Sequence, residues 1–292
     1  MKSFLRKIVR KLYTEKIVFR EPGIISHDLP PTFIFGVHRS GTTLLRLILD
    51  SHSRIAVPLE SMFIMSLSQM WQDPLSMKGF AGMGFTSEHV RRKLKEFADY
   101  YFDSYTAAQG KVRWVDKCPH YIDCMDFIEE VYGPDCRYVF LYRHGLDVAC
   151  SVADMPIEPA ESHKIECGDP RVGGARYWAL QSEKLLSFQK KVGARGIAVH
   201  YENLVSEPET VVREILQHIG EEWEEQILRF YEFDHCRGPG LEDPKASYSK
   251  KLGQSMGNWL SLEPELVQRM LTEAGPTLER LGYSHEHPRL EG

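Results

Sequence analysis

Short apolar runs alternate along the chain with longer segments in which apolar residues recur at helical spacing. Residues 33–37 and 138–142 are the clearest runs, and their nearly continuous apolar character is typical of strands buried on both faces of a parallel sheet. Further strands are expected at 55–57, 111–115 and 197–201. Helices are predicted at 43–52, 60–71, 88–105, 121–132, 145–153, 174–192, 208–219 and 263–281. Alternating strands and helices predict an α/β fold, with a central parallel sheet flanked by helices in three layers.

Three stretches interrupt this alternation. Residues 73–86 contain one proline and three glycines, so we expect a mobile loop there, followed by Ser87 as the cap of the next helix. Residues 156–172 and 234–258 are predicted to be irregular because they lack a periodic apolar pattern. None of these stretches has the character of a linker between two cores, so residues 30–285 are expected to form a single domain.

The first 22 residues have a different pattern and are expected to form a basic amphipathic helix. Phe4, Ile8 and Leu12 fall on one helical face, and residues 1–20 contain seven Lys or Arg against one Glu, which gives this segment a net charge of +6. Such a helix either packs on the body of the protein or makes peripheral contact with an anionic membrane surface. No apolar run approaches the ~20 residues of a membrane span, and basic residues interrupt any signal-peptide core.

Composition excludes some classes of function without selecting one. The 292 residues are 42% hydrophobic and 26% charged with a net charge of −5, which is ordinary for a globular protein and gives no reason to expect a nucleic-acid partner. The six cysteines include no C-x-x-C pair, and no metal site is expected. Free thiols are the simplest interpretation of these cysteines, and they favour a reducing, cytoplasmic location. If the N-terminal helix binds a membrane, the protein would lie at the inner membrane surface.

The most informative segment follows the first strand. Gly36 and Gly41 have the spacing of the phosphate-binding loop G-x-x-x-x-G-K-S/T, but Thr42 occupies the lysine position while Thr43 keeps the hydroxyl. Arg39, inside the loop, supplies a cation instead. Because a helix begins directly after the loop, its first N–H groups can bind an anion. The residues predicted to contact this anion are Arg39, Ser40, Gly41, Thr42, Thr43 and Leu44.

A second anion site is predicted after the strand at 138–142. Arg143 stands at the end of this strand and Ser151 lies about two helical turns further on, so a guanidinium and a hydroxyl can clamp a phosphate. Sites in such folds lie at the carboxyl ends of the strands, where the loop is also expected. Two phosphate sites, one without the kinase lysine, indicate a nucleotide phosphorylated at both ends of its ribose.

These motifs resemble those of sulfotransferases that use 3′-phosphoadenosine 5′-phosphosulfate (PAPS). The segment G-V-H-R-S-G-T-T-L-L resembles the family's 5′-phosphosulfate loop, and R-H-G-L-D-V-A-C-S resembles its 3′-phosphate motif, with Arg143 and Ser151 in the matching places. The run from the loop to Glu60 is most similar to tyrosylprotein sulfotransferases and their bacterial relatives. Further matches are Asp116-Lys117-Cys118-Pro119, Tyr201-Glu202-Asn203-Leu204 and Leu281-Gly282-Tyr283. The resemblance spans residues 32 to about 284 and implies a single P-loop-type domain.

The resemblance also implies roles for individual residues. Glu60 is the expected general base, which takes the proton of the acceptor, and His120 is the rival because other branches of the family use a histidine. Arg39 and Lys117 are expected to bind the phosphosulfate and to stabilise charge on the leaving oxygen. By position alone, Glu60 would be a carboxylate at a helix N-terminus and His120 a polar residue at a helix start. The family needs no Mg²⁺ for this reaction.

Tyr201 and a late basic loop complete the cofactor site that the resemblance implies. Residues 250–259, K-K-L-G-Q-S-M-G-N-W, resemble a family loop that closes over the 3′-phosphate, although they include two extra residues and Asn in place of Asp. Lys250 and Lys251 are both candidates for the contact with the 3′-phosphate.

The predicted reaction is the transfer of a sulfuryl group from PAPS to a hydroxyl or amine, which leaves adenosine 3′,5′-bisphosphate. No motif identifies the acceptor, which is a small molecule, carbohydrate, lipid or peptide, and its pocket is expected between residues 60–110 and 154–172. Two alternatives stay open. A P-loop small-molecule kinase shares the fold, although Thr42 argues against it, and a catalytically silent nucleotide-binding protein at a membrane surface would use the basic N-terminus.

Overall fold

The computed structural model describes residues 29–233, 235 and 256–284, so the basic N-terminal segment, Lys250 and Lys251 lie outside the described residues. Five parallel strands form one sheet in the order β2-β3-β1-β4-β5. The strands are β1 (Thr32–Gly36), β2 (Ile55–Ala56), β3 (Arg113–Lys117), β4 (Arg137–Tyr142) and β5 (Gly196–His200). The predicted α/β fold with a central parallel sheet is confirmed.

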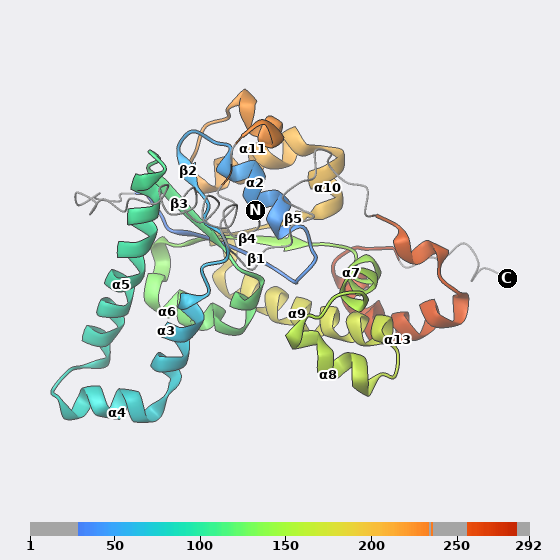
Figure 1. Cartoon of the computed structure of the whole chain (residues 1–292), viewed down its shortest axis with the longest axis horizontal. Coiled ribbons are helices and arrows are strands. Elements are labelled where there is room, and N and C mark those ends of the chain that lie inside the picture. Colours follow the sequence, from blue (N-terminus) through green and yellow to red (C-terminus); the bar gives the residue numbers. More distant parts are fainter. Residues whose placement is uncertain (1–28, 234, 236–255, 285–292) are drawn as a thin grey trace, which may run out of the picture.

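Helices cover both faces of this sheet (Figure 1). The α-helices are α2 (Thr42–Asp50), α3 (Phe63–Gln72), α4 (Pro74–Gly82), α5 (Ser87–Ala108), α6 (Met125–Tyr132), α7 (Gly145–Ala153), α8 (Glu158–Glu166), α9 (Pro170–Val192), α10 (Tyr201–Ser206), α11 (Pro208–Ile219) and α13 (Pro264–Arg280). Short 3₁₀ segments include η1 (Pro119–Cys124), η4 (Glu225–Glu232) and η5 (Asn258–Ser261).

Successive residues of the central strands belong to two different cores. Ile34 and Val139 pack in the core under α2, α11 and η4, whereas Phe33 and Tyr138 pack in the core under α5, α6 and α9. Because side chains alternate across a strand and both faces are covered, every residue of β1 is buried. This burial explains the nearly continuous apolar runs in the sequence.

The strand order places the candidate site at one edge of the sheet. β1 is paired with β3 on one side and with β4 on the other, and its register sets Ile34 opposite Lys117 and Gly36 opposite Leu141. The chain therefore leaves β1, β3 and β4 at the same carboxyl edge, where ligands of such folds bind. The helix that follows β4 is α7. It approaches α9 so closely that a Cβ on Gly145 would lie 2.4 Å from the Trp178 ring, so the glycine permits this contact.

Two stretches that were predicted to lack regular structure are helices. α4 forms within 73–86 because the Asp73 carboxylate accepts hydrogen bonds from the N–H groups of Leu75 and Ser76, and because Pro74 occupies its first turn. α8 forms within 156–172 through contact with α9, where Gly173 lets the two backbones approach.

The cap of α5 was also predicted wrongly. Thr86 rather than Ser87 is the N-cap, because its hydroxyl accepts a hydrogen bond from the N–H of His89 at 3.2 Å.

Together α3, α4 and α5 form a helical lobe that projects from one end of the sheet (Figure 1). No helix among the described residues is long and apolar enough to cross a membrane. Membrane contact through residues 1–20 stays a prediction, since that segment is not described.

Candidate active site

The loop between β1 and α2 turns sharply through two residues with positive φ. Arg39 has a φ of 69° and Gly41 a φ of 93°. A Cβ on Gly41 would lie 2.4 Å from Cδ2 of Tyr201, so the ring fixes how closely the chain passes. The N-terminus of α2 has neither a side-chain cap nor an acidic residue in its first turn, and the buried Ser40 hydroxyl has no hydrogen-bond partner within the described part of the chain. Such a set of donors fits an anion.

The remaining loop residues begin α2. Thr42, in the position of the kinase lysine, is 4% exposed, and its methyl group would lie 2.8 Å from a Cβ on Gly36. Thr43 and Leu44 are half-buried in the first turn of the helix. All the loop residues predicted from the sequence therefore lie around one helix N-terminus.

Arg143 joins the second predicted anion site to the loop. Its Nη1 donates a hydrogen bond to the carbonyl oxygen of Arg39 at 2.7 Å, and its guanidinium lies 4.7 Å from the ring centroid of Tyr201. In turn, Nε of Arg39 donates to Oγ of Ser151 at 2.9 Å. The two predicted anion sites are thus in direct contact, with Arg39 shared between them.

Lys117, at the end of β3, forms an ion pair with Glu60. Its Nζ lies 3.1 Å from Oε1 of Glu60, the lysine side chain is fully buried, and the glutamate side chain is 10% exposed. Two residues predicted for the same site therefore meet, although they are far apart in the sequence. Because water is largely excluded, this cation acts strongly on any charge beside it.

Two histidines lie next to this pair. Nε2 of His38 lies 3.3 Å from Nε2 of His120, and Nδ1 of His38 lies 2.7 Å from the Tyr177 hydroxyl. Burial, followed by the charges of His120, Lys117 and Arg39, lowers the pKa of His38 from 6.5 to about 3. The His38 ring is therefore neutral at physiological pH. His120, the rival base, belongs to the same cluster.

The end of the predicted late loop, residues 257–259, is attached to α7. The Asp147 carboxylate accepts hydrogen bonds from the N–H groups of Gly257 at 2.9 Å and Asn258 at 2.8 Å. Trp259 stacks on the ring of His144, with 5.0 Å between centroids and 4° between planes. Residues 257–259 thus lie on the helix that carries Ser151. Lys250 and Lys251 are not described, so their contact with a phosphate stays a prediction.

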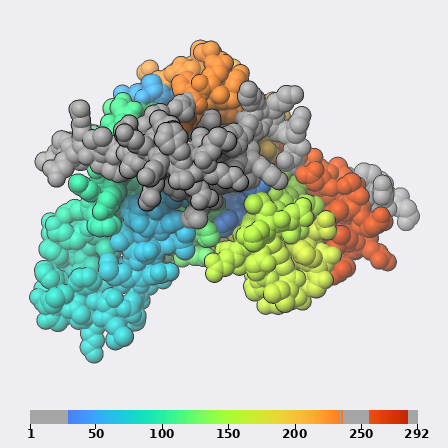
Figure 2. Space-filling model, in the orientation of Figure 1, coloured from blue at the N-terminus to red at the C-terminus, as the bar shows by residue number. Residues whose placement is uncertain are grey.

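The outer surface is notched between the helical lobe and α8. Figure 2 shows the lobe in cyan on one side of the notch, α8 in yellow-green on the other, and dark blue residues from the start of the described chain at its base. These walls correspond to residues 60–110 and 154–172, the two segments expected to form the acceptor pocket.

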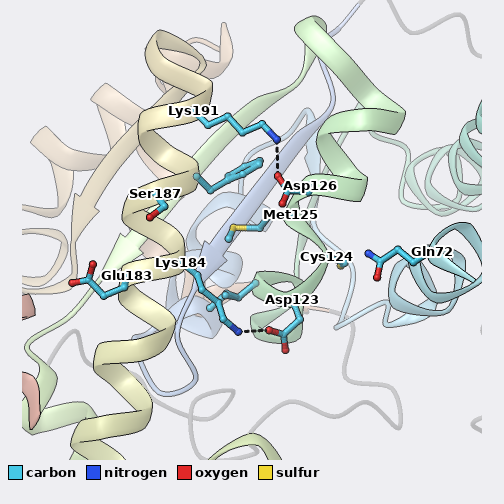
Figure 3. Close-up of a pocket in the computed structure, with 11 residues that line it drawn as sticks. Gln72, Asp123, Cys124, Met125, Asp126, Glu183, Lys184, Ser187 and Lys191 are labelled. Carbon is cyan, nitrogen blue, oxygen red and sulfur yellow. Dashed lines mark hydrogen bonds and ion pairs between the residues drawn. The ribbon is translucent and has the colours of Figure 1, made fainter.

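A separate cavity lies between η1–α6 and α9 (Figure 3). Its volume is about 640 Å³, and two ion pairs border it, Lys184 with Asp123 at 2.7 Å and Lys191 with Asp126 at 2.6 Å. None of the predicted site residues that the structure describes lines this cavity. The candidate active site is therefore the cluster at the sheet edge.

Comparison with known families decides the class of protein. A model described as the sulfotransferase family matches residues 30–225, a range that contains Arg39, Glu60, Lys117 and Arg143. The chain belongs to the sulfotransferase family. The prediction of a sulfotransferase is thereby confirmed, and neither a kinase nor a catalytically silent protein is favoured.

Named relatives of this sulfotransferase support the assignment. The chain is 25% identical over 281 residues to protein-tyrosine sulfotransferase 1 of Danio rerio, covering 91% of this chain and 76% of the relative. It is 28% identical over 227 residues to an uncharacterized protein of Aquifex aeolicus, covering 76% of this chain but 29% of that protein. The solved sulfotransferase domain from the curacin biosynthetic pathway shares the fold, with a TM-score of 0.62, 19% identity and coverage of 90% of this chain and 100% of that chain.

The candidate active site also contains residues that sequence reasoning did not assign. They are His38, Ser61, Asp116, Tyr121 and Tyr177. His38 and Asp116 stand directly before predicted site residues inside recognised motifs, so their position was a usable signal. Tyr177 lies within α9 and Tyr121 within η1, and no local pattern marks either of them.

Proposed function

We propose that this sulfotransferase transfers the sulfuryl group of PAPS to a hydroxyl or amine of its acceptor. The observation that carries the proposal is the 3.1 Å contact between Glu60 and Lys117 beside an anion-binding loop that has Thr42 in place of the kinase lysine. Phosphoryl transfer in P-loop enzymes uses that lysine together with Mg²⁺. Sulfuryl transfer requires a base on the acceptor and cations on the leaving oxygen.

The loop and the Arg143 region suit the two ends of the donor. The N–H groups at the start of α2 and the Ser40 hydroxyl, which has no hydrogen-bond partner among the described residues, would hold the 5′-phosphosulfate. Arg143 and Ser151 would hold the 3′-phosphate, with Tyr201 as the platform between loop and guanidinium. Because Arg39 contacts both Arg143 and Ser151, it would couple the two ends. Lys250 and Lys251 remain candidates for a further 3′-phosphate contact.

The residues around Glu60 suit the chemical step. Lys117 holds one carboxylate oxygen, Oε1, so the other is positioned to accept the proton of the acceptor. As the acceptor oxygen or nitrogen bonds to sulfur, the bond from sulfur to the bridging phosphate oxygen breaks. Its electron pair leaves with adenosine 3′,5′-bisphosphate. Lys117 stabilises the charge that develops on that oxygen.

The acceptor is proposed to enter between the α3–α5 lobe and α8. Aromatic side chains are exposed on this lobe, including Phe97, Tyr100 and Tyr101. One relative is named a protein-tyrosine sulfotransferase, which makes a peptide one candidate acceptor beside a carbohydrate, a lipid or a small molecule. The lobe contains none of the recognised family motifs, so its residues are expected to determine which acceptor binds.

Calorimetric titration with adenosine 3′,5′-bisphosphate tests the donor assignment. The wild-type protein is expected to bind, and Arg39→Ala and Arg143→Ala are each expected to weaken binding by about 10- to 100-fold, because each removes a charged hydrogen-bonding group. Arg213→Ala, which removes an exposed arginine paired with Glu209, is the matched control and should bind like the wild type. Unchanged binding in both site variants, or tighter binding of ATP with Mg²⁺, would contradict the proposal.

A further inference from the structure

The last two residues of β3 and the residue that follows it contact three successive residues of the segment before α3. Asp116 accepts a hydrogen bond from the Ser61 hydroxyl at 2.8 Å, and Lys117 contacts Glu60 at 3.1 Å. Sγ of Cys118 lies 3.4 Å from the sulfur of Met62. The base of the proposed reaction is therefore one member of a set of side-chain contacts between the two segments.

Asp116 is unusual in this set because its carboxylate is completely buried. Burial raises its pKa to about 6, against the opposing effect of hydrogen bonds from Ser61, Tyr121 and the N–H of Lys117. The hydroxyls of Ser61 and Tyr121 are themselves hydrogen-bonded to each other. A buried carboxylate is costly unless its donors are in place, so this carboxylate fixes the position of Ser61.

The segment that carries Glu60 depends on such external contacts. It lies between β2 and α3 and belongs to neither. Met62 has a φ of 54°, a strained conformation for a residue with a side chain, and such strain persists where the surroundings impose it. The adjoining turn is tight, with the N–H of Phe63 donating to the carbonyl oxygen of Ser61 at 2.6 Å. Without its contacts to β3, this segment would relax and carry Glu60 with it.

We propose that Asp116 is a positioning residue that acts through Ser61 to hold Glu60 against Lys117 in the orientation that accepts the acceptor proton. The inference rests on the proposed function, in which Glu60 is the base. Because Asp116 is completely buried, it would act on the reaction through its neighbours and not by contact with the donor or the acceptor. Its effect is to fix a carboxylate whose displacement by about 1 Å would cost about 100-fold in rate.

Four variants test this role. Asp116→Asn removes the positioning role. The two carboxylate oxygens of Asp116 accept hydrogen bonds from Ser61 and from the N–H of Lys117, whereas an amide has only one oxygen that can accept. Ser61→Ala removes the tether and leaves the charge of Asp116, whereas Ser61→Thr retains the hydroxyl. Ser68→Ala is the matched control, since it deletes a buried hydroxyl of α3 that accepts a hydrogen bond from Gln72.

The expected pattern separates positioning from folding. Asp116→Asn and Ser61→Ala should each lower kcat by about 10- to 100-fold, while the KM for PAPS and the affinity for adenosine 3′,5′-bisphosphate change by less than about twofold. Ser61→Thr should keep most of the wild-type kcat, and Ser68→Ala all of it. In the Glu60→Gln background, Asp116→Asn should lower the residual rate no further, because the base through which it acts is absent.

A wild-type kcat in Ser61→Ala would overturn the inference, and so would an additional loss on adding Asp116→Asn to Glu60→Gln. The proposed function fails in a different way. Its failure would be seen as wild-type protein that does not bind adenosine 3′,5′-bisphosphate, whereas failure of the inference would be seen in a protein that binds it normally and loses turnover in Glu60→Gln.

Discussion

Individual side chains set how closely the backbone approaches the proposed phosphosulfate. The ring of Tyr201 lies against Gly41 and beneath the guanidinium of Arg143, so one aromatic residue supports both segments that are predicted to bind anions. Guanidinium and ring at this distance attract each other, which keeps Arg143 in place before the ligand arrives. The loop glycine is therefore required by its neighbour as well as by its own φ.

This arrangement predicts the effect of a single methyl group. Gly41→Ala should weaken binding of adenosine 3′,5′-bisphosphate by about 10-fold or more, because the new Cβ would displace the Tyr201 ring and the residue would be strained at a φ of 93°. Gly110→Ala is the matched control, since its φ is 67° and a Cβ there meets no atom of the described residues within 4 Å. Calorimetry of both variants checks this, and equal affinities would show that Tyr201 does not control the loop.

At the residue scale, the sequence predicted which residues lie close together where motifs are continuous in the chain. Arg39, Thr42, Lys117 and Arg143 were assigned because each stands at a strand end or helix start, and the structure brings them to one edge. The contact between Arg39 and Ser151 was not predicted. It joins side chains from different elements, and no local pattern encodes which loop residue reaches which helix.

At the scale of elements, predictions succeeded where apolar periodicity alone determines the structure. Helices α2, α7 and α11 were predicted within two residues of their observed bounds, because each packs a continuous apolar face on the sheet. α4 and α8 were missed for different reasons. α4 depends on its Asp73 cap despite three glycines in the stretch, and α8 depends on packing against Gly173 of a later helix.

Strand β3 illustrates why polar residues mislead such predictions. It was expected at 111–115 but runs from Arg113 to Lys117, so it extends into two further charged residues, Asp116 and Lys117, which are buried like Arg113. Arg113 is paired with Glu221 at 2.9 Å, while Asp116 and Lys117 contact Ser61 and Glu60 in the candidate active site. A local pattern would place such residues at the surface, because their partners are distant in sequence.

At the scale of the whole molecule, the buried His38 ties stability to pH. The unfolded chain binds a proton at this residue near pH 6.5, whereas the folded protein does so near 3. The unfolded state therefore binds more protons between these values, so this contribution is present above about pH 6.5 and is lost as the pH falls towards 3. Acid should destabilise the protein in part through His38, which faces His120, Lys117, Arg39 and Tyr177.

Urea unfolding of the wild type and of His38→Gln measures this contribution. Between about pH 7 and about pH 4, the free energy of unfolding should fall less in His38→Gln, since glutamine has no proton to gain. All other titrating groups are common to both proteins, so the difference between the two slopes isolates residue 38. An equal loss of stability in both would show that His38 titrates alike in the folded and unfolded states.

The measurement that tests the central claim most directly is transfer of radiolabelled sulfate from PAPS to a panel of hydroxyl and amine acceptors by wild type and by Glu60→Gln. The wild type is expected to label at least one acceptor. Glu60→Gln should bind adenosine 3′,5′-bisphosphate with wild-type affinity but transfer label about 100- to 10,000-fold more slowly, because the residue that takes the acceptor proton is gone. Transfer by Glu60→Gln at the wild-type rate would contradict the account and move the role of base to His120.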